Sequence, residues 1–318
     1  MKKQLLILIL AVIASSGLYS CKKKYQVIPP PVPFSSIRDS FEFMYNENRQ
    51  SFSFLAEVGT IYTSEEGIIF DIPYYAFRDV AGDTITGTIE AELIEILTPS
   101  DMILMNKPTT SDGEVLVTGG QFKLTFTLND NPVYIAGDTL IYVSVPTDIA
   151  DIKMKVFNGT EDATGFVNWT PALDSLGATQ TTTISQDTLS NGVIQNYYDF
   201  TLDSLSANWI NCDYFYQVPG AKTQLTVTLP DDHNNSNTMF FIHFSNIQSV
   251  MGGYFDGNNF VSNGTIPVGS NVTLVFVSEI DGDYTSKFEA VTISSGFLTS
   301  LTLDPTTYDD IIEDITDL

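Results

Sequence analysis

Strict alternation of apolar and polar residues over several short segments is the feature that most limits how this chain can fold. In residues 122–128, Phe, Leu, Phe and Leu alternate with a lysine and two threonines, and residues 225–229 repeat the pattern. A period of two places one face of an extended strand in a core and the other face in solvent. Further strand candidates are residues 68–73, 88–97, 139–145, 239–244, 272–277 and 288–293. Short strands separated by Gly, Asp and Asn turn signals predict an all-β protein built from β-sandwiches.

Changes in composition divide the chain into segments with different expected structures. These are a lipoprotein signal peptide (1–20), a lipidated cysteine with a proline-rich tether (21–35), a first β-sandwich (50–146), a joining region (147–216), a second β-sandwich (217–300) and a C-terminal helix (301–318). The two sandwiches are expected to be immunoglobulin-like and arranged in tandem. Residues 35–48 are compatible with either a short helix or a loop.

The last segment departs from the period of two. Tyr308, Ile311, Ile312 and Ile315 recur at helical spacing, with acidic residues between them and Pro305 near the start. Proline and acidic residues are typical of the first turn of a helix. The pattern predicts a short amphipathic helix that docks on its own domain, and this is favoured over a helix that binds a partner.

The first 21 residues have the layout of a bacterial export signal. Lys2 and Lys3 precede an uninterrupted apolar run at 5–14, and residues 18–21 read Leu-Tyr-Ser-Cys. The run is shorter than the roughly 20 residues that a membrane-spanning helix needs. The ending resembles a lipobox, in which a peptidase cuts before the cysteine and the thiol is acylated. The sequence therefore predicts lipidation of Cys21, and the alternative is an ordinary secretory signal that contains this cysteine by chance.

Charge and cysteine content restrict the function further. The chain has 14 basic and 39 acidic residues, and removal of the signal with Lys2 and Lys3 would leave 12 basic against 39 acidic residues, a net charge of −27. With a pI near 4.1, the protein would be repelled by nucleic acid, so no nucleic-acid partner is expected. Once Cys21 is acylated, Cys212 has no other cysteine in the chain to pair with, and stability must come from burial.

Several motifs resemble those of a known group of proteins. Residues 67–77 (Gly-Ile-Ile-Phe-Asp-Ile-Pro-Tyr-Tyr-Ala-Phe), 83–87 (Asp-Thr-Ile-Thr-Gly) and 114–120 (ending in Gly-Gly) resemble a domain of uncharacterised outer-membrane lipoproteins of the Bacteroidota. Residues 154–169 and 209–213 are similar to further blocks of these lipoproteins. The N-terminal part is also distantly similar to the β-sandwich domain shared by ankyrins and netrin receptors. The resemblance covers most of 59–269, but its motifs are those of turns and packing, so it implies no catalytic residues.

The resemblance and Cys21 together predict a place at the outer membrane, with the membrane as a partner through the lipid. Repeated prolines at 29–33 favour an extended spacer of about 3.1 Å per residue. Surface-exported lipoproteins of the Bacteroidota tend to carry acidic residues after the acylated cysteine, whereas Lys22, Lys23 and Lys24 follow Cys21 here. We therefore favour the periplasmic face of the outer membrane over the cell surface.

The sequence contains no recognisable catalytic or metal-binding motif. The two histidines, His233 and His243, lack the paired cysteines or further histidines with which zinc sites are usually built. Cys212 lies next to Asp213 and among aromatic and apolar residues, which predicts a packed thiol rather than a nucleophile. No cofactor is expected, and the protein is not predicted to be an enzyme.

Acidic residues provide two further candidates. Glu90, Glu92 and Glu95, or the C-terminal acids, are candidates for the acid–base pair of a glycoside hydrolase, but the abundance of carboxylates makes this choice unspecific. Glu90 and Glu92 share one face of the expected strand, which we take to be the solvent face. The turns at 256–258 and 281–283 contain oxygen ligands suited to calcium, but both are ordinary turn sequences, and no metal site is assigned.

Aromatic residues concentrate near the expected junction of the two sandwiches. They are Tyr197, Tyr198, Phe200, Trp209, Tyr214, Phe215 and Tyr216. Exposed aromatic faces could stack on sugars in a glycan cleft. Packing in a core is favoured, because large aromatic side chains dominate the cores of β-sandwiches.

Asp followed by Ser or Thr and then an aliphatic residue occurs five times, which is more often than composition predicts. The pattern resembles the acceptor motif for O-glycosylation of exported Bacteroidota proteins. The candidate sites are Thr84, Thr139, Ser175, Thr188 and Ser204. The alternative is that these pairs mark turns, where both side chains bond to the nearby backbone.

These observations predict a lipid-anchored cell-envelope protein with a non-enzymatic structural or binding role. A glycan or another envelope protein is the candidate partner. The alternative function is an envelope hydrolase or glycan-processing accessory that uses dispersed carboxylates.

Overall fold

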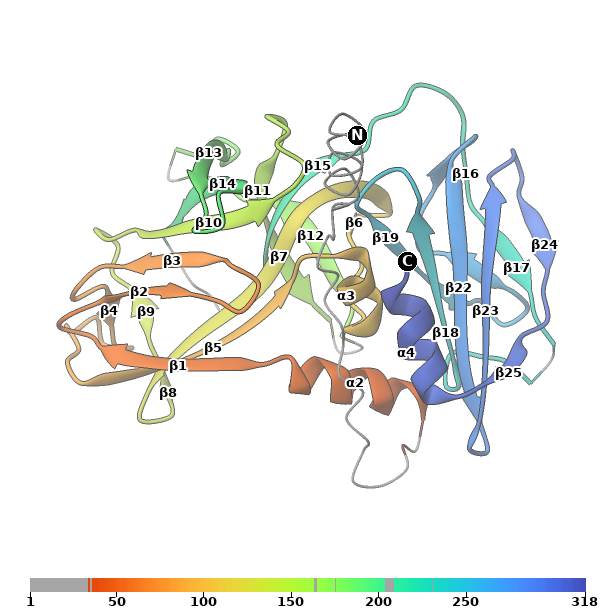
Figure 1. Ribbon diagram of the computed structural model, residues 1–318, viewed down its shortest axis with the longest axis horizontal. Coiled ribbons are helices and arrows are strands. Elements are labelled where there is room, and N and C mark those ends of the chain that lie inside the picture. Colours follow the sequence, from red (N-terminus) through yellow and green to blue (C-terminus); the bar gives the residue numbers. More distant parts are fainter. Residues whose placement is uncertain (1–33, 35, 163–164, 175, 204–208, 231) are drawn as a thin grey trace, which may run out of the picture.

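The computed structural model describes residues 34, 36–162, 165–174, 176–203, 209–230 and 232–318. Strands make up 51% of the structure and helices 9%, which confirms the all-β class. Figure 1 shows two β-rich bodies, the first on the left and the second on the right, with three helices between them.

The first body is a sandwich of two antiparallel sheets. The larger sheet has the order β1 (Gln50–Leu55), β5 (Thr88–Ile96), β7 (Glu114–Leu128), β15 (Trp209–Phe215), β11 (Lys155–Glu161), β12 (Val167–Pro171), with β6 (Thr110–Ser111) and β8 (Asn131–Pro132) paired to β7. The smaller sheet has the order β13 (Thr183–Thr188), β14 (Ile194–Leu202), β10 (Ile141–Thr147), β3 (Ile69–Ile72), β2 (Thr60–Thr63). Strands β4 (Phe77–Arg78) and β9 (Tyr134–Ile135) form a separate pair. Apolar residues of the facing sheets, among them Phe70, Phe122 and Phe200, form what we call the sandwich core.

Strand β7 confirms the alternation seen in the sequence and then departs from it. Phe122, Leu124 and Phe126 are buried, whereas the residues between them are half-buried. Residues 115–121 are buried on both faces because this end of β7 continues between the two bodies. A period of two therefore describes only the part of the strand that has one solvent face.

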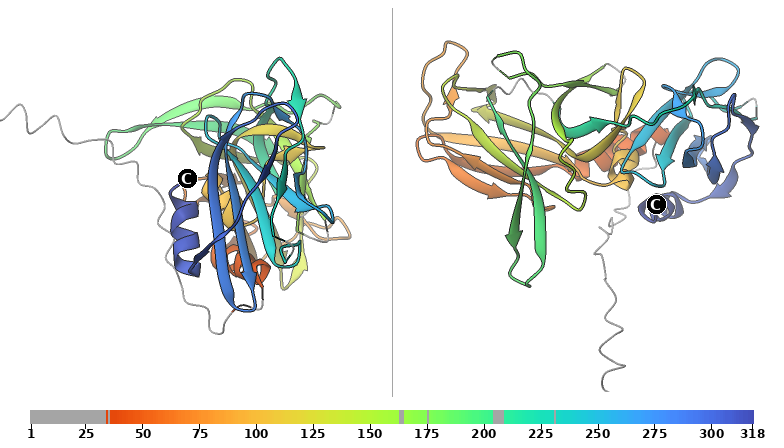
Figure 2. Two further views of the ribbon diagram at one scale, coloured as in Figure 1. Left: turned by 90° about the vertical axis from the view of Figure 1, so that its right-hand side faces the viewer. Right: turned by 90° about the horizontal axis from the view of Figure 1, so that it is seen from above.

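Residues 147–216, expected to join two sandwiches, contribute five strands to the first body. Strands β11, β12 and β15 extend the larger sheet, and β13 and β14 form one end of the smaller sheet. The right-hand view of Figure 2 shows the β13–β14 hairpin, in green, projecting from the first body. This projection explains the polar composition of the segment, since most residues of β13 are exposed.

The second body is one curved sheet with the order β24 (Leu298–Ser300), β17 (Thr226–Thr228), β20 (Phe260–Ser262), β19 (Val250–Phe255), β18 (Thr238–Phe244), β22 (Asn271–Ile280), β23 (Asp283–Thr292), β25 (Asp304–Thr306). A short pair, β16 (Lys222–Thr223) and β21 (Ile266–Pro267), lies beside it. The concave side encloses an outer core that includes Phe240, Phe260 and Phe276. The opposite side of β18 and β22 is also buried, against the three helices.

Those helices form a layer between the bodies, made of α2 (Ile37–Glu47), α3 (Pro99–Leu104) and α4 (Tyr308–Thr316). Ser36 caps the N-terminus of α2 by accepting a hydrogen bond from the Asp39 amide, so the helical alternative for residues 35–48 is correct. Apolar residues of the helices pack against the larger sheet of the first body and the sheet of the second body. We call this cluster the shared core, and it includes Phe41, Met102, Phe241 and Ile311.

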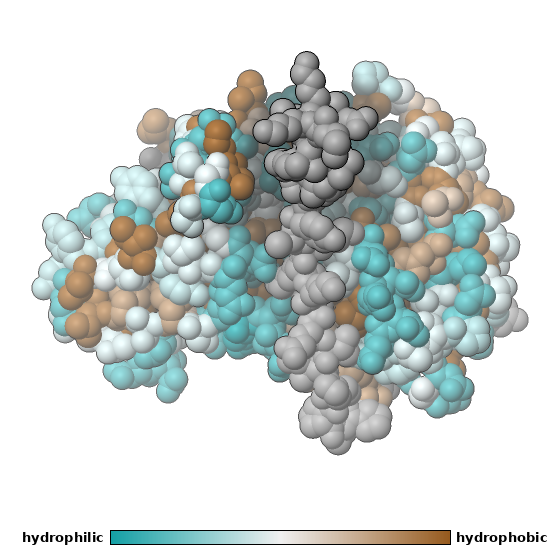
Figure 3. Space-filling view, viewed as in Figure 1, coloured by the Kyte–Doolittle hydropathy of each residue, from teal (hydrophilic) through white to brown (hydrophobic). Residues whose placement is uncertain are grey.

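The C-terminal helix is confirmed, but it begins later than the boundary of 301–318 suggested. Asp304–Thr306 form strand β25. Thr307 is the N-cap of α4, because its hydroxyl accepts a hydrogen bond from the Asp310 amide at 3.2 Å. The helix docks in the shared core, and Figure 3 shows hydrophilic residues over its outward side.

Backbone contacts also join the bodies. The Thr109 amide donates to the Val250 carbonyl at 2.8 Å, and the Thr118 amide donates to the Gln248 carbonyl at 3.0 Å. Gly264 approaches Gly113 so closely that a Cβ atom on Gly264 would lie 1.9 Å from the Gly113 carbonyl oxygen. Only glycine fits there, so this contact is built into the sequence.

Candidate functional site

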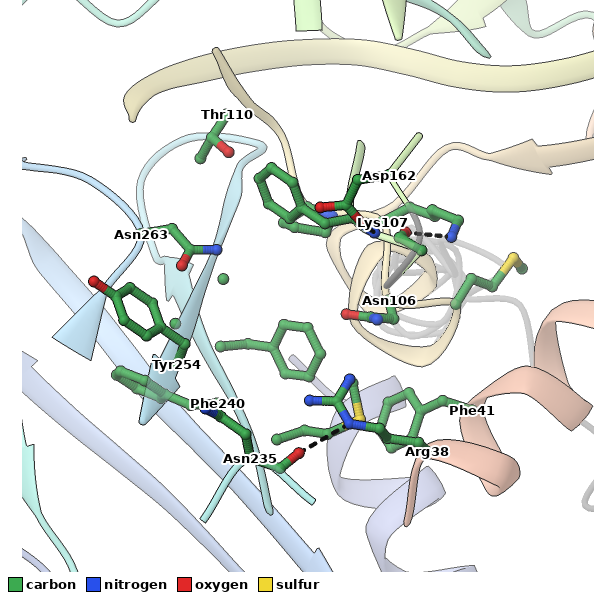
Figure 4. Close-up of a pocket in the computed structure, with 18 of the residues that line it drawn as sticks. Arg38, Phe41, Asn106, Lys107, Thr110, Asp162, Asn235, Phe240, Tyr254 and Asn263 are labelled. Carbon is green, nitrogen blue, oxygen red and sulfur yellow. Dashed lines mark hydrogen bonds between the residues drawn. The ribbon is translucent and has the colours of Figure 1, made fainter. Parts of the chain in front are cut away.

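A cleft of about 1280 Å³ lies between the two bodies. Its walls come from α2, the loop between α3 and β6, the turn between β11 and β12, and strands β18 and β19 in the middle of the second sheet (Figure 4). Segments far apart in the sequence therefore meet at one site.

Helix α2 supplies one wall through residues spaced three and four apart. Arg38, Phe41 and Tyr45 fall on the same side of the helix, as this spacing requires. The Phe41 ring stacks against Phe241 of β18, with centroids 6.1 Å apart. Since Phe41 also belongs to the shared core, the packing that joins the two bodies fixes this wall of the cleft.

At the inner end of the cleft, Lys107 lies almost fully buried in a charged and aromatic cluster. Its ammonium group donates to Glu161 at 2.9 Å and to the Gly165 carbonyl at 2.8 Å. It also lies 5.1 Å from the centre of the Tyr45 ring and 5.7 Å from that of Trp209. Such placement over ring faces is a favourable cation–π geometry.

Glu161 is the centre of this cluster. Its other oxygen accepts from the Trp209 indole at 3.1 Å and from Lys123 at 3.2 Å. Burial alone would raise the pKa of Glu161, but the hydrogen bonds and charges of Lys107, Trp209 and Lys123 outweigh burial and lower it. Glu161 is therefore held as a carboxylate.

The same surroundings act on the other titratable groups of the cluster. Burial lowers the pKa of Lys107, with Glu161 opposing the change. Burial and the charge of Glu161 raise the pKa of Tyr45 to about 12. Glu161 is thus held as a carboxylate and Tyr45 as a neutral phenol, which suits a structural support beneath a binding surface.

The opposite wall belongs to the second body. Tyr254 at the end of β19 is 45% exposed, and Asn263 lies in the turn after β20. Gly252 and Gly253 have no side chains, so the backbone of β19 is uncovered just before Tyr254. A Cβ atom on Gly253 would lie 2.2 Å from the Phe240 ring, so this strand must carry glycine to pack as it does.

The candidate nucleophile suggested by sequence is buried in the sandwich core. Cys212 is fully buried, and burial, with the charge of Asp213 adding to it, raises the pKa of its thiol well above the ordinary value. The neighbouring Asp213 is also fully buried, and its pKa is raised well above the ordinary value by burial. Both residues lie on β15 and outside the cleft.

The histidines and the candidate carboxylates are likewise dispersed. His233 is buried and lies 3.0 Å from the Thr238 hydroxyl, whereas His243 lies within β18. Glu90 and Glu92 are exposed, as expected for the solvent face of their strand. Glu95 is buried and accepts hydrogen bonds from Gln50, Ser64 and the Glu66 amide.

Turn chemistry accounts for one of the suggested calcium sequences. Asp256 accepts hydrogen bonds from the amides of Asn258 and Asn259, and these bonds lower its pKa. Among the residues with assigned positions, no group of three or more His, Cys, Asp or Glu side chains is arranged to hold a metal ion.

Two of the glycosylation candidates, Thr84 and Thr188, are exposed, and Thr139 is half-buried. Ser175 and Ser204 lie outside the described residues, as do Cys21 and the signal segment.

The aromatic residues near the junction divide between packing roles. Tyr197, Tyr198, Phe200 and Trp209 are buried, which confirms the preference for core packing over an exposed aromatic cleft at these positions. Trp209 nevertheless stabilises the inner end of the cleft through its contacts with Glu161 and Lys107. The residues that line the cleft openly were missed by sequence reasoning, because Asn106, Tyr254 and Asn263 are isolated in the sequence and carry no motif.

A comparison with known protein families finds no match to this chain, and a comparison with curated proteins finds none either. None of the helices in the described ranges combines the length and apolar character needed to cross a bilayer.

Proposed function

We propose that this protein is a lipid-anchored component of the cell envelope that binds a ligand and does not catalyse a reaction. The cleft of about 1280 Å³ between the bodies carries the proposal, because its walls present both aromatic side chains and polar groups. Ligand sites in proteins are typically concave, with apolar walls and a small number of placed polar groups. In this proposal Cys21 bears the lipid, and residues 21–35 tether the bodies to the outer membrane.

Contacts of Phe34 support this arrangement. Its ring lies 5.6 Å from Phe43 of α2 and 5.3 Å from Tyr308 of α4. The tether would therefore join the protein at the helical layer, beside the α2 wall of the cleft. We place the protein on the periplasmic face, because Lys22, Lys23 and Lys24 stand where surface-exported lipoproteins of the Bacteroidota tend to carry acidic residues.

Labelling with an alkyne analogue of palmitate tests the anchor. Label is expected on the wild type and absent from Cys21→Ala, which should also leave the membrane fraction. Cys212→Ala is the matched control and should retain the label, because Cys212 is fully buried. Equal labelling of the wild type and Cys21→Ala would refute the anchor. Protease treatment of intact cells should leave the protein uncut if it faces the periplasm.

The alternative function, a hydrolase with dispersed carboxylates, has less support. Glu90 and Glu92 are exposed on a sheet outside the cleft, and Glu95 is held by three hydrogen bonds. In the cleft, the pKa of Glu161 is lowered, whereas a general acid needs a raised one. A reducing-end assay on envelope polysaccharides tests this alternative. Glu42 of α2 is a further carboxylate that lines the cleft, and new reducing ends that disappear in Glu42→Gln would replace the binding role with a hydrolytic one.

O-glycosylation at Thr84, Thr139, Ser175, Thr188 and Ser204 is part of the same proposal. The exposure of Thr84 and Thr188 is compatible with an attached glycan, and equally with turn formation. Intact-mass measurement of protein from its native envelope should exceed the mass of chain plus lipid. A mass equal to chain plus lipid would leave only turn formation.

A further inference from the structure

The charged side chains that line the cleft are mostly bonded within the protein. Glu161 is shared by Lys107 and Lys123. Asp112 accepts from the Asn168 amide group at 3.1 Å. Asp162 accepts from the Phe166 backbone amide at 3.1 Å. These groups shape the walls of the cleft, and their carboxylate oxygens are engaged in hydrogen bonds within the protein.

A second set of polar side chains faces the cleft without a partner in the described part of the chain. The amide groups of Asn106 and Asn263, the hydroxyl of Tyr254 and the carboxylate of Glu42 form no hydrogen bond or ion pair there. Among the described residues, Arg38 bonds only through its Nε, which donates to the Asn235 carbonyl at 3.0 Å, so both of its terminal nitrogens are open toward the cleft in this part of the chain. This open set therefore contains donors and acceptors in similar number.

The open set has no net charge. Arg38 and Glu42 lie four residues apart on α2 and contribute one charge of each sign, whereas the other members are neutral. A strongly anionic ligand would meet the field of a protein with a net charge of −25. A strongly cationic ligand would leave the donors of Arg38, Asn106 and Asn263 without acceptors. A neutral ligand that is rich in hydroxyl groups satisfies both donors and acceptors.

The open groups come from both bodies. Figure 4 shows Tyr254 and Asn263 on one side of the cleft and Asn106 and Arg38 on the other. Tyr254 is 45% exposed, so its ring offers a flat apolar surface next to polar groups. A sugar ring has the same two-sided character, with an apolar face of C–H groups and a rim of hydroxyls. The cleft volume of about 1280 Å³ exceeds the usual range of about 300–1,000 Å³ for compact ligands, and fits several linked units.

We propose that the cleft binds a segment of a neutral oligosaccharide. Asn106, Asn263, Arg38 and Glu42 hydrogen-bond its hydroxyls, and one sugar ring stacks on Tyr254. This inference rests on the proposed binding function and names its ligand class. The buried cluster of Lys107 and Glu161 holds the loop of Asn106 in place but does not itself bind the sugar.

Affinity electrophoresis of the full-length lipoprotein in mild detergent tests the inference. The gels contain neutral polysaccharides (laminarin, yeast mannan, galactomannan or xyloglucan) or anionic ones (polygalacturonate or heparin). Retardation by at least one neutral polysaccharide is expected. Its oligosaccharides should then bind in calorimetry, and Tyr254→Ala and Asn263→Ala should each weaken binding by about tenfold or more, as loss of a central contact does.

Tyr142→Ala is the matched control, because Tyr142 is 55% exposed on β10 and lies outside the cleft. It should bind as the wild type does. Retardation by anionic polysaccharides alone, by none of the panel, or equally by wild type and both cleft variants would overturn the oligosaccharide proposal. Such a result would leave the lipid anchor intact, since that is measured separately by labelling of Cys21. A wild-type protein that takes no label but binds the oligosaccharide would refute the lipid anchor and leave the oligosaccharide proposal intact.

Discussion

The two bodies close their cores in different ways. In the first body, two sheets face each other, and the sandwich core contains no residue of α2, α3 or α4. In the second body, every residue of β18 is buried, because the outer core covers one side and the helical layer covers the other. The first body thus closes its main core with its own strands, whereas the second depends on helices from both ends of the chain.

Because of this difference, helices from the N-terminal part of the sequence pack against the C-terminal body. Helices α2 and α3 precede or interrupt the strands of the first body, yet their apolar residues share a core with β18, β19 and β22 of the second. The bodies should therefore unfold together rather than as independent domains. The cleft depends on the same layer, since Arg38, Glu42 and Phe41 all lie on α2.

The largest expected effect compares the shared core with the sandwich core. Phe241→Ala and Phe122→Ala each remove a buried ring and should each lower the free energy of unfolding by about 3–5 kcal/mol. Because the bodies unfold together, each variant should show a single thermal transition and faster hydrogen exchange in the core strands of both bodies. Independent domains would instead give two thermal transitions, with Phe241→Ala moving only one of them.

The close approach of Gly264 to Gly113 provides the next test. Gly264→Ala would place a methyl group 1.9 Å from the Gly113 carbonyl oxygen, so the two bodies must shift apart. We expect a loss of about 1–3 kcal/mol in urea unfolding, typical of overpacking. Gly137→Ala is the matched control, because no atom of a described residue lies within 4 Å of the added Cβ. Equal stability of the two variants would show that the backbone contact does not join the bodies.

The strand positions could be predicted from sequence because they depend on local pattern. Residues 88–97 and 239–244 are confirmed as parts of β5 and β18, each within a residue or two of the expected limits. The course of residues 147–216 could not be predicted in this way. Its last strand, β15, pairs with β7, more than 80 residues earlier in the chain, as between Trp209 and Lys123, and no local pattern specifies such a pairing.

The cleft could not be predicted for the same reason. It brings together Arg38, Asn106, Tyr254 and Asn263, which are separated by up to about 225 positions and have no common spacing. The buried role of Lys107 was also hidden, since a lysine is normally exposed. The one usable signal was the pair Gly252-Gly253 within a strand, which indicates close approach of another group to the backbone.

The buried carboxyl of Asp213 tests whether a buried titratable group destabilises the first body. Its Oδ2 accepts from the Asn211 amide at 2.8 Å, and its Oδ1 has no partner among the described residues. Burial raises the pKa of Asp213 well above its unfolded value, so its contribution to stability is complete below that value and is lost as the pH rises toward the folded pKa. Asp213→Asn should therefore be more stable than the wild type by about 1–2 kcal/mol at pH 7 and by less at pH 4.5.

Urea titrations at the two pH values measure this difference. Asp71→Asn, at an exposed position of β3, should match the wild type at both. A variant Asp213→Asn that is less stable than the wild type at pH 7 would mean that the buried carboxylate is charged and paired. The face of β15 opposite the sandwich core would then contain a paired charge rather than a destabilising one.

The smallest expected effect concerns Glu161, which links a strand of the first body to the loop that follows α3. Because the pKa of Glu161 is lowered in the folded protein, its contribution to stability is present above its unfolded pKa of about 4.3 and is lost as the pH falls through the folded pKa. Glu161→Gln should therefore cost about 1 kcal/mol from pH 6 to 8 and almost nothing near pH 3. Glu92→Gln removes an exposed pair with Arg49 at 3.0 Å and should cost about 0.3 kcal/mol, since solvent screens it. If both variants lose the same amount at pH 7, the Lys107 cluster is no more than a surface ion pair, and the inner end of the cleft is held by apolar packing alone.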